Sequence, residues 1–145
     1  LALDTFVELY DGGTIRLSEF VNRKPDKDIL LSVIVRKSKR KFRYDSIRQT
    51  KTDFPVIACS VVTGMVHGKE TWYFSVGARP MKAALLEKQW EIPADASEEM
   101  IADYARQAAS EFTYGSNMRG SAEYRRHLAE VLIRREMTSI LAEGR

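Results

Sequence analysis

Strand-forming residues dominate the first half of the chain and helical patterns the last third, and this order constrains the fold more than any other feature. The β-branched and aromatic residues that favour strands concentrate between Thr5 and Val76. Apolar residues from Met100 onward recur at three- and four-residue steps, the period of a helix packed on a core. Strands followed by three predicted helices indicate an α+β fold, in which the helices cover one face of an antiparallel sheet.

A short hairpin and a lone apolar strand are expected first. Asp11-Gly12-Gly13 separates two strand-like runs, and its glycines suit a hairpin turn. Ser18 to Val21 then predicts a single helical turn. The run from Ile29 to Val35 is almost continuously apolar, which predicts a strand buried on both faces or crossing between two layers.

A second hairpin and a short helix are expected in the middle of the chain. Phe54 to Val66 and Thr71 to Val76 are rich in β-branched and aromatic residues, and the polar residues between them predict a turn. Met81 to Lys88 contains consecutive alanines and leucines, which favour a helix.

Two longer helices complete the prediction. Asp95 to Glu98 has the spacing of a capping box and opens a helix that ends by Gly115. A second helix starts near Ser121, which follows Gly120 as a candidate N-cap. The core-facing stripe predicted for this last helix consists of Tyr124, Leu128, Val131, Leu132, Arg135, Met137, Ile140 and Leu141.

Arginines flank that stripe. Arg125, Arg126, Arg134 and Arg135 are interpreted as a solvated face whose stems cover apolar surface. Glutamates interleave with them and would repel phosphates, which speaks against a nucleic-acid helix. Arg119 is expected to fix the preceding turn through an ion pair or a carbonyl cap.

The composition is that of an ordinary globular domain. The chain has 145 residues, 44% of them hydrophobic and 30% charged, with a net charge of +3. A single cysteine, Cys59, excludes an internal disulfide framework and suits a reducing cytoplasm. No apolar run has the length of a membrane span and no signal peptide is recognised. Because the first residue is Leu1, we expect a piece of a longer chain.

The most basic segment, Arg36 to Tyr44, leaves three interpretations open. It could be a solvated loop at a sheet edge, a loop facing an anionic cofactor or partner phosphate, or a nucleic-acid site that stacks bases on its aromatic residues.

The residues do not provide the groups of a self-contained enzyme. His67 and His127 have no second ligand at metal-binding spacing, and Cys59 has no basic neighbour to activate its thiol. No phosphate-cradling glycine motif is present. The residues alone therefore indicate a binding or docking domain, part of something larger.

The turn before the last helix carries a motif that resembles a known family. The FAD-binding subunit of the molybdenum hydroxylases, such as xanthine dehydrogenase and carbon monoxide dehydrogenase, ends in a helix after the motif D-x-R-G-S-A-x-Y-R-R. The sequence from Asn117 to Arg126 matches every position except Asn117. Gly77 to Ala83 resembles the family's turn after a hairpin, and Ile29 to Val35 resembles its strand joining two domains.

The resemblance covers nearly the whole chain and implies two parts. Residues 1–36 would be the trailing segment of the FAD-binding domain. Residues 37–145 would be the flavoprotein C-terminal domain, an antiparallel sheet of three or four strands covered by three helices. FAD would be held mainly by an N-terminal region that this chain does not contain.

The resemblance assigns only a few FAD contacts to residues of this chain. It assigns no catalytic and no metal-binding residue. Leu30 falls where the joining strand touches FAD through an apolar side chain. A lysine that contacts FAD in the family falls at Asp45 or at Arg48, depending on the gap. Arg48 keeps the positive charge, whereas Asp45 would reverse it.

The implied function is support of FAD-mediated electron transfer from iron–sulfur clusters to NAD or another acceptor. This chain alone is expected to be inactive. The implied partners are the N-terminal FAD-binding half and the iron–sulfur and molybdopterin subunits, with a homodimer also considered. Neither nucleic acid nor a membrane is expected, and the location would be cytoplasmic. The alternatives are a protein-interaction domain of the same fold without flavin and a small nucleic-acid binder.

Overall fold

The computed structural model describes residues 1–78 and 82–143. They form two compact units, Leu1–Lys39 and Arg40–Arg145, which we describe one at a time. The predicted α+β class with antiparallel sheets is confirmed.

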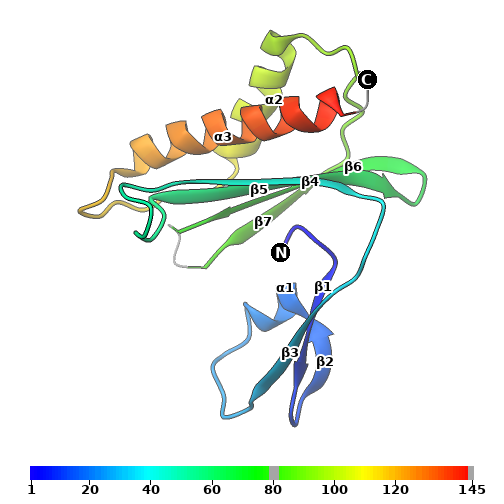
Figure 1. The fold of residues 1–145 in the computed structure, drawn as a ribbon, viewed down its shortest axis with the longest axis vertical. Helices are drawn as coiled ribbons and strands as arrows, with labels where there is room; N and C mark the ends of the chain where they lie inside the picture. Colours follow the sequence, from blue (N-terminus) through cyan, green and yellow to red (C-terminus); the bar gives the residue numbers. More distant parts are fainter. Residues whose placement is uncertain (79–81, 144–145) are drawn as a thin grey trace. The chain divides into compact units, whose positions relative to one another are not determined.

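The first unit is a three-stranded antiparallel sheet with one helical turn (Figure 1). Strand β1 (Thr5–Leu9) lies between β2 (Gly13–Arg16) and β3 (Leu30–Val35), and helix α1 (Leu17–Phe20) follows β2. The predicted first hairpin and helical turn are therefore confirmed.

Asp28 fastens the turn between β1 and β2. Its Oδ1 accepts the backbone N–H of Asp11 at 2.9 Å, and its Oδ2 accepts that of Gly12 at 2.8 Å. These hydrogen bonds, with that from Asp11 the largest effect, hold the pKa of the Asp28 carboxyl below its ordinary value. Gly13 takes a positive φ of 64°, which a side chain would disfavour.

The predicted burial of β3 on both faces is wrong for the residues that the structure describes. The side chains of Leu31 and Val33 are 54% and 57% exposed, and every other apolar residue from Ile29 to Val35 is exposed as well. The physical reason is that burial on both faces requires a packed layer on each side of the sheet, and the described residues leave the apolar side chains of β3 exposed. β3 is also an edge strand, which pairs with β1 alone. A long apolar edge of this kind is a surface that proteins normally pair or cover.

The second unit is a four-stranded antiparallel sheet with two helices on one face (Figure 1). Its strands pair in chain order: β4 (Lys41–Ile47), β5 (Ile57–Val66), β6 (Lys69–Gly77) and β7 (Ala84–Lys88). Helix α2 (Glu98–Ser110) packs against α3 (Ala122–Ala142), and α3 packs on β4 and β5.

The helix predicted for Met81 to Lys88 is wrong. Ala84–Lys88 forms the edge strand β7, which pairs with β6 from Val76↔Ala84 to Trp72↔Lys88. Met81 itself, like the other residues of 79–81 in the predicted family turn, lies outside the described residues. Alanine and leucine favour helices only weakly, and pairing at the open edge of β6 overrides that preference. Among the described residues, the second unit therefore has the helices α2 and α3, and the third helix, α1, belongs to the first unit.

Both helix starts are capped by serine hydroxyls. Ser97 Oγ accepts the backbone N–H of Met100 at 3.2 Å, and Ser121 Oγ accepts that of Tyr124 at 3.2 Å. The start predicted near Ser121 is confirmed, and Ser97 rather than Asp95 is the cap of α2.

The core lies between the sheet and the two helices. The sheet contributes the stacked pair Trp72 and Phe74, with ring centroids 6.4 Å apart. The other main members of the core are Ile57, Cys59, Val61, Val76, Ile101, Ala105, Ala108, Ala129, Leu132, Ile133, Met137 and Ile140. The stripe predicted for α3 is only partly right, because Tyr124 and Arg135 are exposed while Arg125 and Glu136 lie on the buried face.

Arg125 connects three segments inside the core. It is 1% exposed, and its guanidinium donates through Nη1 to the Val56 carbonyl at the start of β5. Nη2 donates to Asn117 Oδ1 at 2.5 Å, and Nε to the Gly120 carbonyl at 3.4 Å. The prediction that Arg125 belongs to a solvated face is therefore wrong, because these buried carbonyls need a donor.

Replacing Arg125 by alanine should lower the free energy of unfolding by about 2–4 kcal/mol, because the buried Val56 carbonyl and the part-buried acceptors of Asn117 and Gly120 lose their donor. Arg126→Ala is the matched control, since Arg126 is exposed on the same helix and its loss should cost within about 0.5 kcal/mol. Urea denaturation of the three proteins measures both values. Equal stability of the two variants would contradict the connecting role of Arg125.

Candidate functional site

The sequence points to strand β4 as the candidate site, because Asp45 lies on it and Arg48 follows it directly. β4 is the edge strand of the four-stranded sheet and pairs with β5 from Lys41↔Thr63 to Ile47↔Ile57. The loop interpretation of residues 36–44 is therefore wrong from Lys41 onward.

The charged side chains of β4 contact helix α3. Lys41 Nζ donates to the Ile140 carbonyl at 3.4 Å, and Arg43 Nε donates to Ser139 Oγ at 2.9 Å. Arg43 also forms an ion pair with Glu143. Since alternate side chains of a strand point to opposite faces, the aromatic residues between these cations lie on the face away from the helices.

Those aromatic residues are exposed. Phe42 is 53% and Tyr44 59% exposed, and Phe42 shares a cross-strand row with Val62 and Tyr73. The guanidinium of Arg40 lies 4.9 Å from the centre of the Tyr73 ring. This open face offers flat apolar surface and one stacked cation, which suits contact with a planar ring or with another protein surface.

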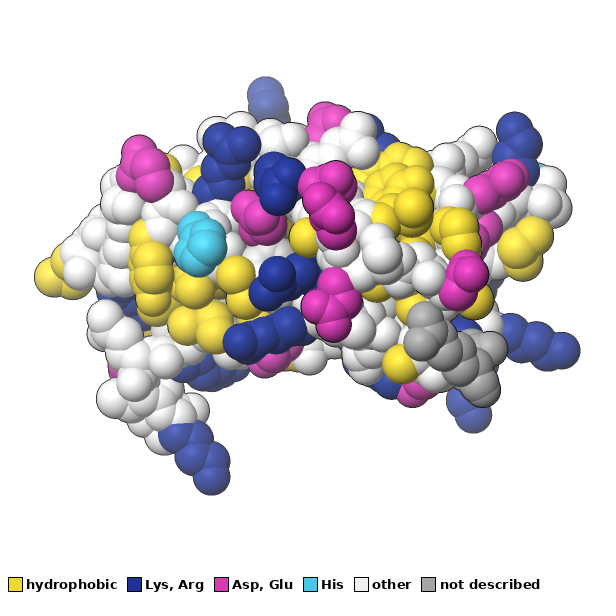
Figure 2. Space-filling view, turned by 90° about the horizontal axis from the view of Figure 1, so that it is seen from above, with side chains coloured by type: hydrophobic (Ala, Val, Ile, Leu, Met, Phe, Trp, Pro, Cys, Tyr) yellow, Lys and Arg dark blue, Asp and Glu magenta, His cyan; other side chains and the backbone are white. Residues whose placement is uncertain are grey.

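The same geometry weakens the nucleic-acid interpretation of residues 36–44. Lys41 and Arg43 bind α3 on one face while the aromatic side chains lie on the other, so those two cations do not contribute to a stacking platform. Figure 2 shows Lys and Arg intermixed with Asp and Glu over the helix-bearing side, without a basic stripe.

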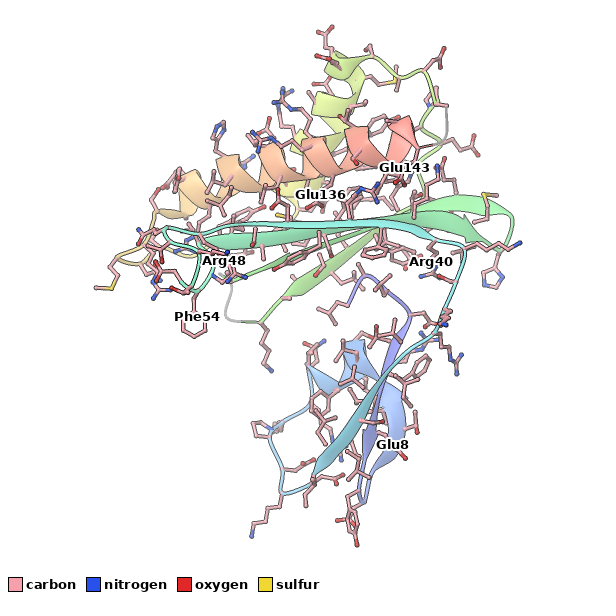
Figure 3. The ribbon with its side chains drawn as sticks, in the orientation of Figure 1. Glu8, Arg40, Arg48, Phe54, Glu136 and Glu143 are labelled. Atoms are coloured by element: carbon pink, nitrogen blue, oxygen red, sulfur yellow. The ribbon has the colours of Figure 1, made fainter. Side chains whose placement is uncertain are left out.

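Arg48 is held at one end of the sheet (Figure 3). Its Nη1 donates to the Asp53 carbonyl at 3.0 Å and its Nε to Ser46 Oγ at 3.3 Å. Asp45 Oδ1 accepts the backbone N–H of Ser46 at 2.7 Å. Leu30 is on β3 in the other unit and is 46% exposed. The flavin contacts assigned to Leu30, Asp45 and Arg48 stay predictions.

Arg119 does not have the predicted structural role. No ion pair or carbonyl bond of its side chain is found among the described residues, and its guanidinium instead lies 5.7 Å from the centre of the Phe54 ring. Arg125, six residues further along, makes the carbonyl contacts that fix the turn. The motif therefore forms a structural turn, as predicted. The carbonyl contacts predicted for Arg119 are made by Arg125.

Glu136 is a buried acid that the sequence did not reveal. It is 4% exposed, between α3 and the sheet (Figure 3), and neither carboxylate oxygen has a hydrogen-bond partner within the described chain. Burial first, and the nearby Asp45 carboxylate second, raise the pKa of Glu136 to about 8. The Asp45 backbone N–H lowers this pKa slightly without forming a regular hydrogen bond.

Cys59 is a core residue, as predicted. It is 1% exposed, and burial, followed by the charges of Glu136 and Asp45, raises the pKa of its thiol. A thiol in this environment is neutral and unreactive. No group of three or more metal-ligating residues occurs in the part of the chain that the structure describes. Among its helices, none is long and apolar enough to cross a bilayer.

The described residues thus form an α+β fold with two antiparallel sheets, and helices α2 and α3 cover one face of the larger sheet. The sequence matches the CO dehydrogenase flavoprotein C-terminal domain family over residues 42–140, and the chain belongs to that family. No curated protein matches the sequence.

Solved structures share the fold over both units. Quinoline 2-oxidoreductase from Pseudomonas putida 86 matches with a TM-score of 0.78 at 16% identity, over 98% of this chain and 54% of the other. Carbon monoxide dehydrogenase from Hydrogenophaga pseudoflava matches with a TM-score of 0.73 at 14% identity, over 97% and 54%. Carbon monoxide dehydrogenase from Oligotropha carboxidovorans matches with a TM-score of 0.68 at 18% identity, also over 97% and 54%. The chain thus spans about half the length of the solved chains it matches.

The raised pKa of Glu136 predicts that stability falls as pH rises. Between its ordinary value near 4.5 and about 8, the folded protein keeps a proton that the unfolded chain has released. The free energy of unfolding should therefore decrease by up to about 1.4 kcal/mol per pH unit across that window. Glu136→Gln, a neutral isostere, should flatten this decline and raise the stability relative to the parent most near pH 8.

Glu91→Gln is the matched control, because Glu91 is exposed in a loop and its removal should leave the slope unchanged. Denaturant titrations at several pH values compare the three proteins. A parental slope in Glu136→Gln would show that another group holds the proton.

Proposed function

We propose that this chain is the C-terminal part of the FAD subunit of a molybdenum hydroxylase-type oxidoreductase. There it would support the transfer of electrons through FAD from iron–sulfur clusters to NAD or another acceptor. The family match over residues 42–140 carries the proposal. The solved structures, matched with 54% of their length, support it through the fold alone.

Two exposed apolar surfaces support the proposal that another part of the subunit packs on this chain. In the first unit, β3 presents an apolar edge from Leu30 to Val35. In the second unit, the face of β4 opposite the helices presents Phe42 and Tyr44. Surfaces of this kind are costly in water, and an N-terminal FAD-binding half of the same subunit is the proposed cover.

The proposed role of this chain toward FAD is placement rather than chemistry. FAD itself supplies the redox reaction, while the protein positions it and tunes its electrostatics. Arg48 would offer a cation to the cofactor from the end of β4, Leu30 would add apolar contact, and Asp45 is the weaker candidate because it already lies beside buried Glu136. The residues present fit a peripheral contact and not a complete flavin pocket.

The proposed partners follow from the same assignment. They are the N-terminal half that holds most of the FAD and the iron–sulfur and molybdopterin subunits of the complex, in the cytoplasm. One similar solved structure is a Cu,Mo-CO dehydrogenase, and another is a carbon monoxide dehydrogenase that lacks the Mo-pyranopterin moiety of its molybdenum cofactor. An alternative is a protein-interaction domain of the same fold without flavin, which the absence of catalytic groups among the described residues also suits.

The visible absorption spectrum separates these two functions. We expect the 145-residue chain alone to purify colourless, and to take up FAD with flavin absorption when produced together with the N-terminal half of its subunit. A protein that stays colourless in both preparations would contradict the flavoprotein assignment and favour the interaction domain.

Within the flavin-loaded subunit, Arg48→Ala should weaken FAD binding roughly tenfold or more, because one charge-assisted contact is lost. Lys51→Ala is the matched control, since Lys51 is exposed in the same turn. Fluorescence titration with FAD gives the affinities. Thermal melts without FAD report any loss of stability caused by removing the hydrogen bonds of Arg48 to Asp53 and Ser46. Unchanged affinity in Arg48→Ala would remove Arg48 from the site and leave the family assignment intact.

A further inference from the structure

The hairpin that precedes α3 is a rigid platform. Asn117 and Gly120 exchange two backbone hydrogen bonds, each 3.1 Å long. The Asn117 side chain accepts the Arg119 backbone N–H at 3.0 Å, and Arg125 ties the same side chain to the start of β5. The backbone of Arg119 is therefore fixed, and its side chain is presented from a defined position.

The guanidinium of Arg119 is available for binding. It lies over the Phe54 ring at 5.7 Å and forms no ion pair with any described residue. A guanidinium near an aromatic ring can still donate its N–H groups, and no side-chain hydrogen bond of Arg119 is found among the described residues. Those groups have the geometry that matches the two oxygens of a carboxylate.

A positively charged hollow lies beside this arginine. Its volume is about 260 Å³. Its lining consists of Phe54, Pro55, Ala78, Asn117, Arg119 and Arg125, and no described acid belongs to it. Two larger hollows on the helices differ in this respect, because Glu99 and Asp103 line one and Glu98 lines the other. Charge alone therefore distinguishes this hollow as a site for an anionic group.

Apolar side chains flank the cation. Met118 is 97% exposed at the tip of the hairpin, and Phe54 is 77% exposed. Exposed methionine and aromatic residues around an arginine are typical of protein–protein contacts, where one buried charge pair is surrounded by apolar contact. A site for a small free anion needs no such apolar border.

We propose that Phe54, Met118 and Arg119 form a docking surface for a carboxylate from an acidic, apolar-flanked segment of a protein partner. The carboxylate would pair with Arg119 at the mouth of the hollow, and its apolar neighbours would cover Met118 and Phe54. This site involves no flavin and lies outside the proposed FAD contacts, so it stands or falls separately from the proposed function.

The test is a titration of the isotope-labelled 145-residue chain, followed by nuclear magnetic resonance at physiological ionic strength, where long-range attraction is screened. The probes are the blocked peptide acetyl-Leu-Glu-Leu-amide, its Gln analogue and inorganic phosphate. The expected result is a saturable shift of the Arg119 Nε–H and the Met118 amide with the Glu peptide. The Gln peptide should bind roughly tenfold more weakly, because it lacks the charge-assisted pair.

Variants assign the site. Arg119→Gln should abolish the shifts, Met118→Gln should weaken binding severalfold, and Arg126→Gln on the exposed face of α3 should leave binding unchanged. Spectra of each variant without peptide verify that it is folded. Equal binding of the Glu and Gln peptides, or equal shifts at Arg126 and Arg119, would overturn the proposal. Saturation of the site by phosphate more tightly than by the Glu peptide would also overturn it, in favour of a free oxyanion site.

Discussion

The buried guanidinium of Arg125 holds the second unit together at one end of its sheet. A single side chain satisfies carbonyls from the start of β5 and from the turn before α3, and orients the Asn117 amide between them. Because these partners are far apart in sequence, the position of α3 on the sheet depends on this contact. The helix in turn packs on β4 and β5, and Cys59 and Val61 of β5 belong to the same core as the buried residues of the helix. A lysine would not replace it, since one ammonium group lacks the forked donors that reach three acceptors.

Much of this fold could be read from the sequence, and the exceptions have physical causes. The hairpins, the cap of α3 and the α+β order follow from local patterns, which the structure confirms, whereas α2 is capped by Ser97, two residues after the expected Asp95. Strand β7 was predicted as a helix because its residues favour a helix, whereas an unpaired edge of β6 decides its conformation. Strand β4 was missed because its basic residues look like a loop, although they bind α3 rather than water.

The candidate site was less predictable, because its key groups are exceptions to the usual burial of charge. The buried face of a helix is predicted from its apolar residues. The sequence therefore did not predict that Arg125 and Glu136 lie on the buried face of α3. The motif suggested a structural role for Arg119, whereas in the structure Arg125 makes the carbonyl contacts. Strand β3 is the opposite case: its apolar run was correctly predicted to be a strand, but the predicted burial on both faces is wrong among the described residues.

The first strand and the last helix of the second unit meet. Lys41 donates to the Ile140 carbonyl, and Arg43 pairs with Glu143, so the beginning of this unit lies against its end. The four strands of the sheet pair in sequence order, and the β5–β6 connection is a tight turn in which His67 and Gly68 have positive φ. Units with adjacent ends commonly tolerate circular permutation, because the packing of a core does not depend on where the backbone is opened. Because β4 and α3 are in contact, the order in which the segments of this unit are synthesised should affect how fast the unit folds and not which fold it reaches.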